Sequence, residues 1–320
     1  MSAAKSAGGP RKGSNAKAKR GPNLKIPAPV QPPAESDENS DASEDLARRV
    51  VRKIPPIPRT GWLRRTSFEQ WLYNKGSRRR YLGENGSSAL SRTSERALGV
   101  AVTGLAFFLY LITTAHYQIA GDTPDFLLAS KTFGVAHPPG YPTLVMLGHL
   151  FSFLPLGSTA FRIDLLAAVC SSATVAFVYL TGLRLTQRPY AAALGAGALA
   201  FTPLFWQWSL QIETFPLNNL LVAGVIYFIV RWHQDPQRST FLYVAGALFA
   251  VGLTNQQTIL LLAPAIGYVV WLNRRTLVAN PIIVGWSVLW IVVGLLPYLY
   301  VPLAATFGHS PDNWDHANSV

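Results

Sequence analysis

Residues 97–116 read ALGVAVTGLAFFLYLITTAH, an apolar run without Asp, Glu, Lys or Arg. A helix rises 1.5 Å per residue, so about 20 such residues cross the roughly 30 Å hydrocarbon core of a bilayer. The run therefore predicts a transmembrane helix. Because a long polar tail precedes it, it is expected to act as a signal anchor and not as a cleaved signal peptide.

The chain continues from this helix as a series of similar apolar runs. Of its 320 residues, 49% are hydrophobic and only 14% are charged, which is too apolar for an ordinary soluble domain. We expect an all-α polytopic membrane protein that has the lipid bilayer as its solvent. The predicted spans are 97–116, 164–184, 190–206, 214–232, 240–254, 257–272 and 281–303, and they define a membrane module over 97–303.

The run 143–156 is shorter and lies between Pro142 and Pro155, so it is predicted to be an interfacial or re-entrant helix inside a first loop, 117–163. Charge supports this choice. Six arginines then share one side with the basic tail: Arg184, Arg188, Arg231, Arg238, Arg274 and Arg275. The positive-inside rule therefore predicts a cytosolic N-terminus, a luminal first loop and a luminal stub over 304–320.

The tail carries most of the net charge of +12, since 20 of the 28 Lys and Arg residues lie before residue 97. Residues 1–60 are predicted to be disordered, and the basic, aromatic segment 61–96 to be either a helix on the membrane surface or an unstructured linker. The pattern lacks a basic groove with interleaved aromatics, so we expect attraction to an anionic leaflet and no nucleic-acid partner. The sequon at Asn85 would be cytosolic and unmodified. The single cysteine, Cys170, is expected to be a small core residue.

The first luminal loop holds the most promising chemistry. It reads GDTPDF over 121–126 and GVAHPPGYP over 134–142. Carboxylates at Asp122 and Asp125, followed by His137 on a rigid proline turn, have the composition needed to deprotonate a hydroxyl group. The alternative is that the two acids cap a helix and that the histidine only belongs to a polyproline turn.

Further polar residues are predicted at the same luminal level. Arg162 could bind a phosphate and Asp164 could orient a carboxylate, or both could be interfacial anchors. Together with Asp164, amide and acidic side chains could line a substrate pocket, or the amides could form hydrogen bonds between helices; they are Gln207, Glu213, Asn218 and Asn255. No HExxH or paired-histidine spacing occurs, so no metal site is predicted.

The order of the motifs is specific. GDTPDF, GVAHPPGYP, STAFRIDLL, FWQWSLQIETFPLNNL, LTNQQT and LLPYLYVPL occur in this succession. Over about 97–303 the chain resembles the transmembrane protein 260 family of eukaryotic protein O-mannosyltransferases, which is similar to the glycosyltransferase C superfamily with its seven-helix module. The resemblance implies transfer of mannose from dolichyl phosphate mannose to Ser or Thr of plexin-type immunoglobulin-like domains in the endoplasmic reticulum. No firm cofactor is implied beyond this lipid-linked donor, and a need for a divalent metal stays open.

Carried residue by residue, the family's Gly-Asp falls on Gly121 and Asp122, which implies that Asp122 is the general base of an inverting single displacement. The family continues with Ser-Gly-Glu where this chain has Thr-Pro-Asp, so Asp125 keeps the acid but shortens it. His137 and Arg162 fall on the family's HPPGYP and AFR motifs, and either could bind the donor and stabilise its departing phosphate. Glu213 and Asn218 fall on its WQWS…E…NN pattern.

The family continues past the seventh span, whereas this sequence stops at Val320. The sequence is therefore expected to be either a fragment or a bare module. Two other functions compete with the glycosyltransferase: a non-catalytic membrane scaffold or truncated pseudoenzyme, and a small-molecule transporter. The transporter is disfavoured because the charged residues cluster at the ends of the spans and no inverted repeat is visible.

Overall fold

The computed structural model describes residues 91–114 and 121–307, all of which belong to one compact unit of the chain. The predictions for residues 1–90, including the disordered tail and the Asn85 sequon, lie outside the described residues. The predicted luminal stub does as well, apart from its first residues. The first described helix begins at Arg92, ahead of the predicted span at 97.

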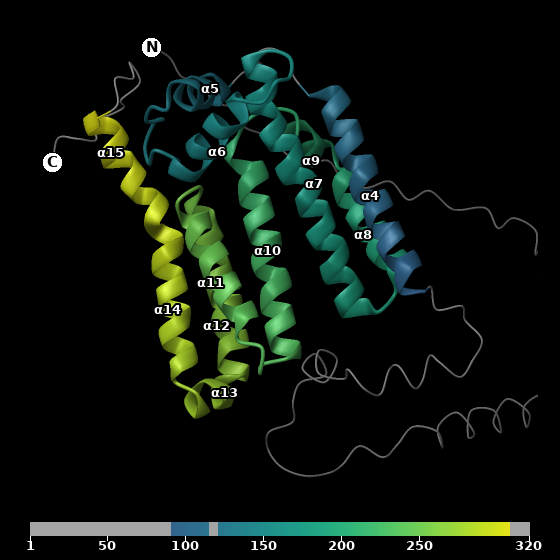
Figure 1. Cartoon of the computed structure of the whole chain (residues 1–320). Helices are drawn as coiled ribbons and strands as arrows, with labels where there is room; N and C mark the ends of the chain where they lie inside the picture. Colours follow the sequence, from purple (N-terminus) through teal and green to yellow (C-terminus); the bar gives the residue numbers. More distant parts are fainter. Residues whose placement is uncertain (1–90, 115–120, 308–320) are drawn as a thin grey trace, which may run out of the picture. The chain divides into compact units, whose positions relative to one another are not determined.

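The described residues form helices, with no β-strand among them (Figure 1). The expectation of an all-helical protein is confirmed for this part of the chain. In chain order the helices are α4 (Arg92–Thr113), α5 (Thr123–Thr132), α6 (Pro142–Ser152), α7 (Thr159–Thr186), α8 (Pro189–Ala200), α9 (Pro203–Trp208), α10 (Thr214–Gln234), α11 (Thr240–Leu253), η1 (Gln257–Leu262), α12 (Ala263–Leu272), α13 (Arg274–Ala279), α14 (Ile282–Leu295), η2 (Leu296–Leu299) and α15 (Tyr300–Phe307).

Four of these helical segments are long and apolar enough to cross a membrane: α4, α7, α10 and the continuous segment Ile282–Phe307. The apolar segments Pro189–Ala200, Thr240–Leu253 and Gln257–Leu272 are shorter than a usual span. All seven predicted spans are thus helical, and four have the length to cross. The complete seven-span topology stays a prediction. Helix α6 has 11 residues, in keeping with the prediction that its run does not span.

Helices α7 and α10 form the centre of the bundle. They pack against each other, with α4 and α8 beside α7, α11 beside α10 and α14 beside α11. In the most apolar stretch of each helix, 67% of the residues are buried in α7 but only 11% in α4. Helix α4 and the 282–307 segment therefore turn large apolar side chains outward, as helices in contact with lipid do.

Small residues allow two of these contacts to be close. A Cβ atom on Gly294 of α14 would lie 2.6 Å from the Ala247 carbonyl of α11, so only glycine fits there. On Gly148 of α6 it would collide with the Ser130 side chain of α5. Small residues at helix contacts are typical of membrane bundles, where packing brings helices together in place of a hydrophobic driving force.

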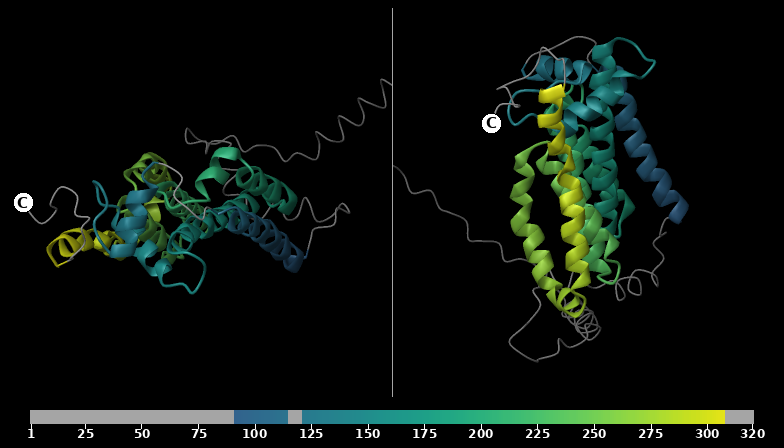
Figure 2. Two further views of the ribbon diagram at one scale, coloured as in Figure 1. Left: turned by 90° about the horizontal axis from the view of Figure 1, so that it is seen from above. Right: turned by 60° about the vertical axis from the view of Figure 1, so that its left-hand side comes forward.

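The two ends of the bundle differ in charge. At one end Arg184 of α7 donates to Gln234 of α10 (3.5 Å), and His233 of α10 lies 2.8 Å from Asn273 before α13. Most of the arginines after residue 162 belong to this end. Helices α5 and α6, with Asp122 and Asp125, lie at the opposite end (Figure 2). This separation is the one that the positive-inside reading predicts.

Candidate functional site

Asp122 is the N-cap residue of α5, but its side chain makes no capping hydrogen bond. Pro124 in the first turn suits a helix start, where a missing N–H costs nothing. The Asp122 carboxylate is 65% exposed, and Asp125, one turn further on, points to another partner. The Asp122 side chain is therefore not used for capping and is open to solvent, whereas Asp125 is engaged by His137.

Asp125 holds His137 in a fixed orientation. Its Oδ2 atom accepts from His137 Nδ1 at 2.6 Å and from the His137 backbone N–H at 3.1 Å. A carboxylate only accepts hydrogen bonds, so Nδ1 carries the donated proton and Nε2 is turned the other way. Nε2 lies 3.9 Å from Asp122 Oδ2. The imidazole thus connects the two carboxylates, with Asp125 as its orienting group and Asp122 in front of it.

Glu213 is a third carboxyl group close to Asp122 and His137. It is the N-cap residue of α10 and is 6% exposed. The Thr123 hydroxyl donates to the Ile212 carbonyl at 3.2 Å and lies 3.4 Å from Glu213 Oε1, which joins α5 to α10. Burial raises the pKa of Glu213, and the Asp122 carboxylate raises it further. Hydrogen bonds from Thr214 and Thr123 and the charge of His137 oppose this rise in part.

Two predicted pocket residues support the backbone on either side of Glu213. Asp164 is fully buried, and its Oδ1 accepts from the Ile212 N–H at 2.7 Å. Asn255 is also buried, and its Nδ2 donates to the Thr214 carbonyl at 3.0 Å. Buried backbone groups need such partners. Asp164 and Asn255 therefore hold the backbone on the two sides of Glu213 and so help to position its side chain.

The other predicted site residues lie elsewhere or have other partners. The Arg162 guanidinium donates to the carbonyls of Ser152 (2.8 Å) and Leu154 (3.2 Å), so it is engaged in the connection between α6 and α7. Gln207 is exposed on the short helix α9. Asn218 is half-buried on α10, and its Oδ1 is buried with no hydrogen-bond partner in the described structure. The structure brings Asp122, Asp125, His137 and Glu213 together and leaves Arg162 and Gln207 with no described contact to them.

The sequence interpretation assigned no role to Tyr141, although its ring belongs to the site. The Tyr141 ring lies 5.0 Å from that of His137 and 5.1 Å from that of Phe126, centroid to centroid. Burial raises the pKa of Tyr141, and so do the carboxylates of Asp122, Glu213 and Asp125. The only available signal was its place in the HPPGYP motif.

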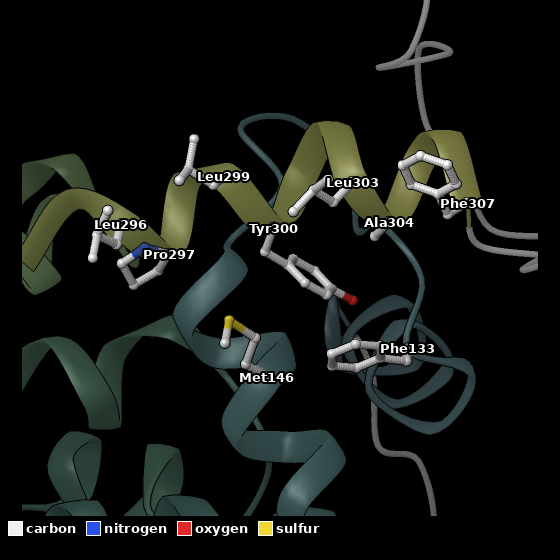
Figure 3. Close-up of a pocket in the computed structure, with 9 residues that line it drawn as sticks. All are labelled: Phe133, Met146, Leu296, Pro297, Leu299, Tyr300, Leu303, Ala304 and Phe307. Carbon is white, nitrogen blue, oxygen red and sulfur yellow. The ribbon is translucent and has the colours of Figure 1, made fainter.

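An apolar groove of about 600 Å³ lies between the α5–α6 region and the η2–α15 segment (Figure 3). Phe133 at the end of α5 and Met146 of α6 form one wall, and residues of η2 and α15, such as Leu303, form the other. Its one hydroxyl, on Tyr300, already donates to the Gly134 carbonyl at 2.7 Å. The groove therefore offers hydrocarbon contacts and no charge.

No group of three or more His, Cys, Asp and Glu side chains in the described ranges is arranged to hold a metal ion. The sequence-based expectation concerns the whole chain and stays a prediction.

The sequence of this chain is similar to those of known proteins. Residues 122–279 match the family model of the Protein O-mannosyl-transferase TMEM260 N-terminal domain. The chain is 30% identical over 243 residues to Protein O-mannosyl-transferase TMEM260 of Mus musculus, covering 72% of this chain and 34% of the mouse protein. The chain belongs to the TMEM260 family. Protein O-mannosyl-transferase tmem260 of Dictyostelium discoideum is 28% identical over 228 residues, covering 66% of this chain and 28% of that protein.

The chain thus spans about a third of the length of these TMEM260 relatives. No solved structure matches it. The TMEM260 match begins at Asp122 and includes His137, Glu213 and Asn255, so the whole carboxylate cluster lies inside it. The η2 and α15 wall of the apolar groove lies beyond its end at residue 279.

Proposed function

We propose that this chain carries the membrane module of a glycosyltransferase that moves mannose from dolichyl phosphate mannose to Ser or Thr hydroxyls of a luminal protein domain. The observation that carries the proposal is the arrangement of Asp125, His137 and Asp122, in which one carboxylate orients an imidazole and the other stands exposed in front of it. The names of the TMEM260 relatives supply the reaction class.

Asp122 is the general base of this proposal. As the acceptor oxygen attacks the anomeric carbon, its proton passes to the Asp122 carboxylate and the bond from that carbon to the phosphate oxygen breaks. The lipid phosphate leaves with the electron pair. A single displacement of this kind inverts the β-linked donor to an α-linked product. Asp122 suits the role because its carboxylate is exposed and makes no capping bond.

His137 is the stronger candidate for stabilising the leaving phosphate. A protonated imidazole would place a positive charge beside the departing phosphate, and the Nδ1 bond to Asp125 fixes the orientation of the ring. Arg162 was the other candidate from the sequence. Its described hydrogen bonds all go to residues 152–159 of the α6–α7 connection, which supports a structural role.

The apolar groove supports a donor with a hydrocarbon chain. Two residues of its wall come from the part of the chain that carries Asp122, Asp125 and His137: Phe133 caps the end of α5, and Met146 belongs to α6. The hydroxyl of Tyr300, which lines the groove, donates a hydrogen bond to the carbonyl of Gly134, three residues before His137. A lipid-linked sugar phosphate could place its phosphate near His137 and its hydrocarbon chain in the groove. The volume of the groove is in the range of known ligand sites.

The acceptor follows from the family resemblance. It is a plexin-type immunoglobulin-like domain in the endoplasmic reticulum lumen, and its hydroxyl group is the nucleophile that the base needs. The carboxylate end of the bundle would then face the lumen, on the side opposite the arginine-rich end.

Acceptor mannosylation in cells tests the proposal. Cells without their own TMEM260 enzyme would express this chain, or a chimera in which its residues 97–307 replace the matching part of the mouse relative. Each of these two proteins would be compared with its Asp122→Asn variant and with the control Asp235→Asn, which changes a half-buried aspartate paired with Arg238 at the other end of the bundle. Mass spectrometry should find hexose on the acceptor with the control and a loss of about a hundredfold or more with Asp122→Asn. Equal modification by Asp122→Asn, or none by any well-inserted form, would contradict the proposal.

A further inference from the structure

Tyr141 has a backbone conformation that its position does not require. Three non-glycine residues in the described ranges have positive φ: Phe133 (54°), Tyr141 (41°) and Gln187 (58°). Phe133 and Gln187 end helices, and their N–H groups close the helix on the carbonyls of Ala129 and Leu183, which is the usual left-handed helix end. Tyr141 precedes a helix, makes no side-chain cap bond and gains no such closure.

A left-handed conformation is unfavourable for a bulky residue, and such residues gather at functional sites. At Tyr141 the conformation brings the ring onto His137 and Phe126. Phe126 is 1% exposed, so Tyr141 and His137 form the outer face of this three-ring cluster. The Tyr141 hydroxyl makes no hydrogen bond with any other described residue.

The surroundings of this ring match a sugar. A pyranose has an apolar C–H face and a rim of hydroxyl groups, so it needs a flat apolar surface beside hydrogen-bond acceptors. Tyr141 supplies the flat ring, and the neighbouring carboxyl groups of Asp122 and Glu213 supply acceptors. The unbonded hydroxyl of Tyr141 adds one group that can both donate and accept.

We propose that Tyr141 is a sugar-binding residue: its ring packs on the mannosyl group of the donor and its hydroxyl binds a sugar hydroxyl, which places the anomeric carbon near Asp122. This inference rests on the proposed function and adds to it the residue that recognises the sugar. The competing role is structural, in which the ring only stabilises the turn against Phe126.

Tyr141→Gly separates the two roles, because glycine adopts positive φ without strain but has no ring. If the ring binds sugar, the KM of the folded variant for the donor should rise about tenfold, whereas a purely structural ring would lower the thermal midpoint and leave KM unchanged. Tyr141→Phe, which loses only the hydroxyl, should raise KM about threefold. Gln187→Gly is the matched control, since it relieves the same backbone conformation at the other end of the bundle and should leave KM unchanged.

A second readout does not depend on turnover. Mannosyl-phosphoryl-polyprenol added to the purified chain should raise the thermal midpoint of wild type and Gln187→Gly, and should raise that of Tyr141→Gly much less. An equal rise in all three, or an unchanged KM for Tyr141→Gly, would overturn the inference. If wild type binds this donor but transfers no mannose, the proposed function fails while the binding comparison still decides the role of Tyr141.

Discussion

Asp122 and Glu213 are neighbouring carboxyl groups with very different access to water. The Asp122 side chain is 65% exposed, whereas Glu213 is 6% exposed and is held between Thr123 and the start of α10. Burial, and then the charge of Asp122, raise the pKa of Glu213 above its ordinary value. Glu213 therefore keeps its proton to a higher pH than a glutamate in water would.

The raised pKa of Glu213 predicts a pH effect on stability. An acid whose pKa is raised by folding contributes fully below its unfolded value of about 4.3, and this contribution is lost as pH rises through the folded pKa. Glu213→Gln, which stays neutral, should therefore become more stable relative to wild type as pH rises. Thermal midpoints in detergent at about pH 4 and about pH 8 measure this, with Glu95→Gln as control. A midpoint difference that stays constant, or falls with pH, would refute the expectation.

The residue types of the site were predictable, but their partners were not. The sequence left Asp122 and Asp125 open between capping and catalysis, because both roles use acids at a helix start. The structure shows the partner of Asp125, which is His137, 12 positions further along the chain and carried by the proline turn. Asp164 likewise finds its partner 48 positions away at Ile212. Contacts between residues so far apart in the sequence cannot be predicted from the local spacing of residues.

At the scale of elements, α5, the turn 137–141 and α6 form one support for the carboxylates and for the groove. Gly140 packs at this turn against Val301 of α15, where an added Cβ would lie 3.2 Å from Val301 Cγ2. The turn therefore joins the carboxylate cluster to the helix whose other residues line the groove. A change in the groove should affect donor binding without touching the acids.

Filling the groove should weaken the hold on long-chain donors. Leu303→Trp places a larger ring in the lining and should raise KM for a long polyprenyl phosphate mannose about tenfold, with little effect on a donor of one or two isoprene units. Leu105→Trp, on the outward face of α4, is the control. Kinetics with the two donors would show the chain-length dependence. An equal effect of Leu303→Trp on both donors would rule out the groove as the chain's binding place.

Element boundaries deviated from prediction where prolines occur. The predicted span 190–206 is two helices, because α8 ends at Ala200 and α9 starts at Pro203. Proline cannot donate a helical hydrogen bond and restricts the residue before it, so the run breaks there. Likewise Pro297 lies where α14 gives way to the 3-10 segment η2. Hydropathy located the apolar runs but could not show where their helices end.

At the scale of the described bundle, charge separates the two ends, and this separation predicts how it lies in the membrane. Glycosylation mapping can test the orientation with a matched pair of sequons. Gly157→Asn creates Asn-Ser-Thr in the α6–α7 turn, at a positive φ of 41° that asparagine tolerates. Gln237→Asn creates Asn-Arg-Ser between α10 and α11.

The luminal assignment of the carboxylate end predicts a glycan on Gly157→Asn and none on Gln237→Asn. A gel shift that glycosidase removes would report each outcome in microsomes. A glycan on Gln237→Asn alone would invert the topology and place Asp122 on the cytosolic side.

The most direct test of the proposed function is the stereochemistry of one transfer. Purified protein would receive synthetic β-linked polyprenyl phosphate mannose and a plexin-type acceptor domain, and NMR would identify the linkage formed. Wild type and Asp235→Asn should give α-linked mannose on Ser or Thr, and Asp122→Asn should give none. A β-linked product, or transfer that persists in Asp122→Asn, would contradict an inverting displacement with Asp122 as its base.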